Sequence, residues 1–385
     1  QSYGVVFDNN INGNFTSKAA ITQQGDDTVA IWLKNGVTGN TYVSGSASGH
    51  GANARAVVLN GVYGGLVNID GSYSTTGYAT TSPSSFTSDQ VKAILATPSD
   101  MYQSGATVTL AGTFGQGVRF STSVTDSDTA NTDEDGNGIV DTDQQAGSIT
   151  AFGTAPALLI GSSTSATTLS PLTYTSTGIQ APTVKYGLLL QGSISAGGVY
   201  TGFTSNAMQI GGLGQPVTIT NGMGITGTVS SSAAAANTTA IAIGANASVP
   251  AVDLLNGTVT AVTSTVTTST TTNGTTTYAT VGQGSKATAI DIAAGATVNA
   301  INITKSGGGI FAAATGSTAN ATAIVDHSGT LQTIINDSAI SASITASDDN
   351  GDGVADTLVN RPIAIDVRAN TSGVIIKQKD RKSVV

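Results

Sequence analysis

The run Ala289-Ile290-Asp291-Ile292 indicates the fold, because its pattern occurs nine times along the chain. In every copy a small residue precedes a short apolar run, and a Gly, Asn or Ser turn then leads into a second run rich in Val and Ile. The copies begin at Ala30, Ala56, Ala157, Gly187, Ala207, Ala240, Ala289, Ala323 and Ala364. A degenerate repeat of one supersecondary unit is typical of a solenoid. Since each unit consists of short strands, the sequence predicts an all-β fold, a right-handed parallel β-helix.

The side chains of a strand point alternately to opposite faces, so the repeat also predicts which residues face the core. Ile243, Ile292 and Val367 are expected inside the solenoid, whereas Asp291 and Asp366 are expected outside it. Stacked strands lie about 4.8 Å apart, and the repeat spacing indicates roughly ten to twelve coils.

The composition limits the class of protein. Aromatic residues make up 5% of the chain and charged residues 10%, so a core of Ala, Val, Ile and Leu must be covered mainly by Ser, Thr, Asn and Gly. The formal net charge of −9 disfavours nucleic-acid binding, which needs clustered Lys and Arg. No cysteine is present, so stability is expected from the strand ladder and from metal. No apolar run approaches about 18 residues, so no transmembrane helix is expected.

The repeat predicts a single solenoid over residues 1–376 and a basic tail over residues 377–385. Insertions are expected at about residues 72–105, 125–147, 263–285 and 346–361. Residues 88–96 in the first insertion resemble a short helix. The third insertion alternates Thr with Val, which predicts a protruding β-hairpin. The second and fourth insertions are acidic.

The two acidic insertions share the pattern D-x-[DN]-x-[DN]-G-h-x-D, in which h is apolar. Oxygens at positions 1, 3 and 5, the carbonyl at position 7 and an oxygen at position 9 converge on a cation when such a loop binds Ca²⁺. The predicted ligands are Asp133, Asp135, Asn137, Ile139 and Asp141 in one loop, and Asp348, Asn350, Asp352, Val354 and Asp356 in the other. Position 12 is Gln144 or Val359 instead of a bidentate Glu, so modest affinity is expected. The alternative is that these residues only form turns.

Signals for catalysis are sparse. His50 and His327 are the only histidines, and no G-x-S-x-G, H-E-x-x-H or P-loop motif occurs. His327 lies between Asp326 and Ser328, but adjacency in the sequence does not give the geometry of a catalytic triad. Asp291 and Asp366 occupy equivalent repeat positions with Arg368 nearby, an arrangement that solvation of an outward face explains. No catalytic residue is therefore predicted.

Residues 51–57 (GANARAV) and 317–324 (STANATAI) resemble the coils of bacterial autotransporter passenger domains. The likeness is to the alanine- and threonine-rich alphaproteobacterial type, whose coils carry D-x-D-x-D-G insertions. The resemblance implies a secreted β-helix displayed at the outer-membrane surface of a Gram-negative bacterium. The start at Gln1 instead of Met favours a signal peptide that has been removed.

Together these features predict a non-enzymatic, calcium-stabilised, adhesin-like protein of the cell surface. Expected partners are a host or neighbouring-cell surface, or a glycan. One alternative is a subunit of a surface layer or extracellular filament, because strand-like Val374-Ile375-Ile376 near the end of the chain invites end-to-end stacking. Another is a polysaccharide lyase or hydrolase built on a β-helix.

Overall fold

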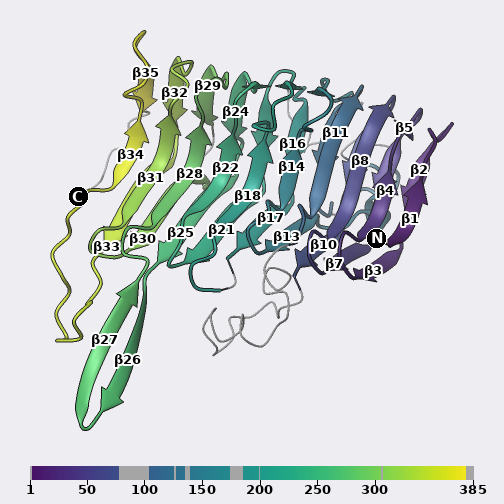
Figure 1. The fold of residues 1–385 in the computed structure, drawn as a ribbon. Helices are drawn as coiled ribbons and strands as arrows, with labels where there is room; N and C mark the ends of the chain where they lie inside the picture. The colour runs from purple at the N-terminus through teal and green to yellow at the C-terminus, as the bar shows by residue number, and fades with distance from the viewer. Residues whose placement is uncertain are drawn as a thin grey trace.

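The computed structural model describes residues 2–77, 104–124, 127–134, 139–173, 185–198, 200–304 and 307–378. These residues form three parallel sheets of 14, 10 and 9 strands, here sheets A, B and C, and one two-stranded hairpin. Each coil contributes a main strand to sheet A, then one strand to sheet B and, in all but the last described coil, one to sheet C (Figure 1). The predicted all-β parallel β-helix is confirmed.

Sheet A has ten strands on its main path and four short side strands. The main path is β1 (Tyr3–Phe7), β4 (Val29–Leu33), β8 (Arg55–Tyr63), β11 (Val108–Phe114), β14 (Leu158–Ile160), β18 (Ser205–Ile210), β22 (Thr238–Ile243), β28 (Lys286–Ile292), β31 (Asn320–Asp326) and β34 (Ile363–Asp366). The side strands are β5 (Gly36–Val37), β15 (Thr167–Leu169), β19 (Val217–Ile219) and β23 (Ala247–Ser248). Ten coils therefore stack along the axis, at the low end of the expected range.

Sheets B and C complete each coil. Sheet B contains β2 (Phe15–Ser17), β6 (Thr41–Val43), β9 (Val67–Ile69), β12 (Val118–Phe120), β16 (Leu188–Leu190), β20 (Met223–Ile225), β24 (Ala251–Leu254), β29 (Ala300–Ile303), β32 (Thr333–Asn336) and β35 (Ile375–Gln378). Sheet C contains β3 (Ala20–Gln24), β7 (Ser46–His50), β10 (Ser72–Thr76), β13 (Ser148–Phe152), β17 (Ser193–Gly197), β21 (Thr228–Ala234), β25 (Thr258–Ser264), β30 (Gly309–Thr315) and β33 (Ala339–Thr345).

The small residue at the start of each repeat has a packing reason. Ala207 and Ala240 are fully buried, and so are the residues that follow them, Met208 and Ile241. The pairing of β18 with β22 skips the two alanines, so the strand bends there and two consecutive side chains face the core. Only a small side chain leaves room for that bend. Gly187 is a correction, because the run after it forms β16 in sheet B instead of sheet A.

The core register follows the sequence prediction up to one residue. Ile243 and Ile292 are neighbours in one row and both are fully buried. Asp291 and Asp366 share an outward row through Val325, as predicted. The inward place beside Ile292 is taken by Asp326, which is 1% exposed. The carboxylate of Asp326 accepts hydrogen bonds from backbone N–H groups of the turn that follows, so it caps the strand end.

Two predicted boundaries are corrected. β10 continues the solenoid to Thr76, so the first insertion begins after this strand instead of at residue 72. β35 pairs with β32 and reaches Gln378, so the predicted tail begins inside a strand. The predicted helix over residues 88–96 lies outside the described residues.

The hairpin predicted in the third insertion is formed by antiparallel β26 (Val266–Thr272) and β27 (Thr275–Val281). It projects away from the solenoid (Figure 1). The only described helix is the three-residue 3-10 helix η2 (Asp141–Asp143) in the second insertion. No described helix has the length and apolar character needed to cross a membrane.

Candidate calcium loops and an adjoining pocket

The second acidic loop connects β33 to β34, and all five of its predicted ligand residues are described. One carboxylate oxygen of Asp348 accepts the backbone N–H of Gly351 at 2.7 Å, and the other accepts that of Gly353 at 2.8 Å. Asp352 accepts the N–H of Val354 at 2.8 Å. Gly351 and Gly353 have φ of +73° and +84°, which favours glycine at both turn positions. The chain therefore winds around the side chain of Asp348.

The first acidic loop is closed by two hydrogen bonds at Asp141. Of its predicted ligands, Asp133, Ile139 and Asp141 are described, whereas Asp135 and Asn137 lie outside the described residues. The Asp141 N–H donates to the carbonyl of Thr132 at 2.9 Å, and the Asp141 carboxylate accepts the N–H of Glu134 at 3.3 Å.

The second loop repeats both closing bonds at equivalent positions. The Asp356 N–H donates to the carbonyl of Ser347 at 2.8 Å, and the Asp356 carboxylate accepts the N–H of Asp349 at 2.8 Å. The described parts of the two loops therefore share the same two closing hydrogen bonds, at two distant points of the chain.

The fit to a cation is partial. Both loop sequences carry the oxygen donors that Ca²⁺ prefers, and in the second loop the backbone turns around Asp348 at position 1. In the structure, however, Asp348 and Asp352 accept backbone hydrogen bonds, and in the described part of the chain no three His, Asp or Glu side chains gather closely enough to hold a metal ion. Calcium binding at the ten named residues therefore stays a prediction.

Asp349, which is not among the predicted calcium ligands, attaches the second loop to the solenoid. Asp349 accepts the hydroxyl groups of Ser347 at 2.6 Å and Ser317 at 2.8 Å. Desolvation alone would raise the pKa of Asp349, but these hydrogen bonds lower it below its ordinary value. On its other side the backbone of Gly351 lies against the ring of Tyr278 in the hairpin strand β27.

The second insertion, at about residues 125–147, contacts three preceding coils. Lys18 forms an ion pair with Asp143 at 2.8 Å. The Tyr42 hydroxyl lies 2.9 Å from both the Asp143 carbonyl and the buried carboxylate of Asp70. The same Asp70 oxygen accepts the N–H of Gln145 at 3.0 Å. Burial raises the pKa of Asp70, because the charged form loses hydration there.

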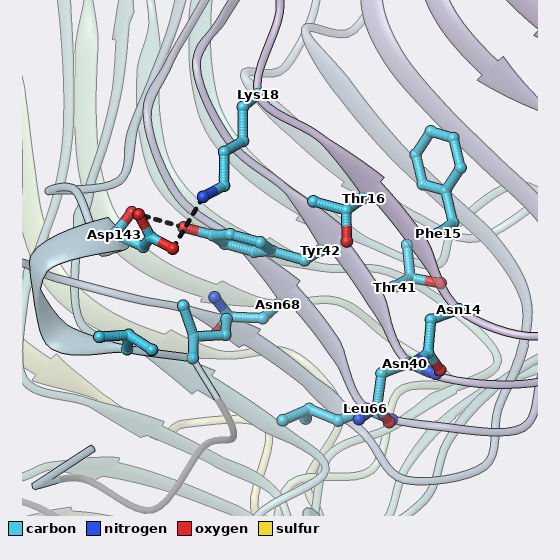
Figure 2. A pocket seen from close by; sticks show the side chains of 12 residues that line it. Asn14, Phe15, Thr16, Lys18, Asn40, Thr41, Tyr42, Leu66, Asn68 and Asp143 are labelled. Atoms are coloured by element: carbon cyan, nitrogen blue, oxygen red, sulfur yellow. Dashed lines mark hydrogen bonds and ion pairs between the residues drawn. The ribbon is translucent and has the colours of Figure 1, made fainter. Parts of the chain in front are cut away.

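A pocket of about 310 Å³ lies between this insertion and sheet B (Figure 2). Lys18, Tyr42 and Asp143 meet on one side of it, and Asn14, Asn40 and Leu66 line another part. The Asn14 side chain accepts the N–H of Asn40, and the Asn40 side chain accepts the N–H of Leu66, so the asparagines form a ladder across coils. No sequence feature indicated this pocket, because its residues come from four separate coils.

His327 does not form a hydrogen bond with the neighbouring Ser328 hydroxyl that could activate it as a nucleophile. The Ser328 hydroxyl donates to Asp326 at 2.6 Å, not to His327. His327 instead lies 3.9 Å from Asp291 on the outward face. Arg368 forms two hydrogen bonds with Asp366, at 2.6 and 2.8 Å, so these groups are paired on the surface.

Comparisons with protein-family models, curated proteins and solved structures found no match for this chain.

Proposed function

We propose that this protein is a non-catalytic, calcium-stabilised β-helix of the bacterial cell surface that works as an adhesin-like passenger. The observation that carries the proposal is the closure of both acidic loops by the same two hydrogen bonds. The recurrence of one closing arrangement at two distant insertions supports a common role for these loops. Calcium at millimolar concentration, as found outside cells, suits loops that lack the bidentate Glu.

The surface of the solenoid supports the same proposal. Sheet C presents Ser, Thr and Gly to solvent over most of its length, and the chain has few charges to gather into a catalytic cleft. A rod with long uniform faces suits adhesion and display better than the conversion of a small substrate.

The test compares melting of the purified protein in calcium and in EGTA. A ligand that binds only the native state at a hundredfold excess over its Kd should stabilise it by about 2.7 kcal/mol. The double variant Asp348→Asn/Asp352→Asn should lose most of the stabilisation by calcium that the second acidic loop contributes. Asp26→Asn, which lies outside both loops, should keep the full stabilisation by calcium. Equal melting temperatures in calcium and EGTA for the unaltered protein would contradict the calcium part. Antibody labelling of intact producing cells tests the surface location.

One observation favours the second candidate, a subunit of a filament. In the last described coil, Ile375 and Ile376 of β35 are 59% and 50% exposed, and the outer edge of β35 pairs with no described strand. Such an edge templates further strand pairing. Light scattering and electron microscopy of the protein and of Ile375→Asp would separate the candidates, because only the filament needs an apolar edge.

A further inference from the structure

The outer face of sheet C between β13 and β30 is a neutral, hydroxyl-rich surface. Its five strands read SITAF, SISAG, TVSSSAA, TVTAVTS and GIFAAAT, and none contains an ionisable residue. The strand register places one residue of each in a single outward row: Thr150, Ser195, Ser230, Thr260 and Phe311. Neighbouring members of this row lie about 4.8 Å apart along the solenoid axis.

Two phenylalanines lie on this face, and each is placed over a glycine. Phe152 pairs in register with Gly197, and a Cβ atom on Gly197 would lie 3.8 Å from the Phe152 ring. The ring of Phe311 lies over Gly309, where a Cβ atom would come within 2.6 Å of it. Because these glycines have no side chain, each ring packs against the sheet. Both rings remain partly exposed.

A shallow groove of about 320 Å³ runs over this face. Phe152 and Val262 line it at opposite ends of one row, and Gly197 and Ser232 lie between them. The hydroxyls of Thr150, Ser195, Ser230 and Thr260 line it in the neighbouring outward row. Thr150 and Ser195 share a hydrogen bond at 3.0 Å. The Ser230 and Thr260 hydroxyls have no side-chain hydrogen bond to another described residue, so they are open to a ligand.

We infer that this groove binds a neutral linear polysaccharide whose chain lies along the solenoid axis. The flat C–H face of a pyranose packs on an aromatic ring, and its edge hydroxyls pair with Ser and Thr. Successive hydroxyls about 4.8 Å apart match a ligand built from similar units of about that length. An anionic polymer would require Lys or Arg, and these five strands have none. The inference rests on the proposed adhesive function and names the ligand class for it.

The experiment measures binding of cellohexaose, chitohexaose and xylohexaose by isothermal titration calorimetry in calcium, with polygalacturonate as the anionic comparison. At least one neutral hexasaccharide should bind, and polygalacturonate should not. Phe152→Ala should weaken binding about tenfold, since a packed aromatic anchor is lost. The matched control is Phe7→Ala, an exposed phenylalanine on sheet A, and it should bind as the unaltered protein does.

The double variant Ser230→Val/Thr260→Val removes two hydroxyls without removing a ring, so it keeps the test valid if Phe152→Ala does not fold. It too should weaken binding. Binding of none of the three hexasaccharides, or equal binding by the groove variants and Phe7→Ala, would overturn the inference. Saccharide binding without a calcium effect on melting would reject the calcium part of the proposed function and leave this inference standing. A calcium effect on melting without saccharide binding would reject this inference and leave the calcium part of the proposed function standing.

Discussion

Replacing Ile292 with Asp is the sharpest test of the core register. Ile292 is fully buried, between Ile243 on one side and the inward carboxylate of Asp326 on the other. Losing the buried sec-butyl side chain costs about 1.5–3 kcal/mol. The new carboxyl group would lie about 4.8 Å from the Asp326 strand, where a second negative charge is unfavourable, so it should stay protonated. Keeping an Asp of ordinary pKa about 3.9 neutral at pH 7 costs about 4 kcal/mol.

The total is about 6 kcal/mol at pH 7, and the second part falls by about 1.4 kcal/mol for each pH unit of acidification. Denaturant unfolding of Ile292→Asp and of the control Ile292→Val should therefore be measured at pH 7 and pH 5. The control should lose about 1 kcal/mol at both values. The gap between the two variants should shrink by about 2.7 kcal/mol at the lower pH. A variant within 1 kcal/mol of the unaltered protein, or a gap that ignores pH, would refute the register.

Three further outcomes follow from single residues. Asp70→Asn should raise stability at pH 7 by about 1 kcal/mol, because the buried charge is removed while an acceptor for Tyr42 remains, and the gain should vanish below about pH 4. Gly61→Ala should cost more than about 3 kcal/mol, because its Cβ would lie 2.3 Å from the Asn35 backbone, whereas Gly202→Ala, with a similar φ of +88° and nothing within 4 Å, should cost about 1 kcal/mol. Asp349 has a lowered pKa, so its contribution to the stability of the folded state should be present above about pH 4 and be lost as the pH falls through the lower folded-state pKa. Melting curves measured at several pH values should show that Asp349→Asn lacks this part of the loss of stability in acid.

The fold was predictable because one physical constraint repeats in the sequence. Runs such as Ala240-Ile241-Ala242-Ile243 bury a small residue and the apolar residues at every second position after it, and stacking such runs leaves one architecture. One inward position departs from the apolar pattern. Asp326 fills an inward position that the pattern assigns to an apolar residue. It is tolerated there because backbone N–H groups of the following turn donate hydrogen bonds to its carboxylate oxygens.

The candidate sites were less predictable, because they depend on register between coils of unequal length. The loop pattern identified Asp348 and Asp352, since their spacing along the chain carries the signal. The row from Thr150 to Phe311 spans five coils separated by insertions, so its members have no fixed spacing in the sequence. The pocket beside Lys18 and Asp143 depends on a contact between the first and fourth coils.

The acidic insertions give this solenoid contacts that its coils alone lack. In a solenoid each coil contacts only its neighbours, so opening one coil need not disturb distant ones. The acidic insertion at about residues 125–147 leaves the fourth coil and contacts the first coil through Lys18, the second through Tyr42 and the third through Asp70. The acidic insertion at about residues 346–361 similarly contacts Ser317 and the hairpin residue Tyr278. A cation that orders either loop would therefore stabilise several coils at once, so calcium loops placed in insertions serve a rod better than loops confined to one turn.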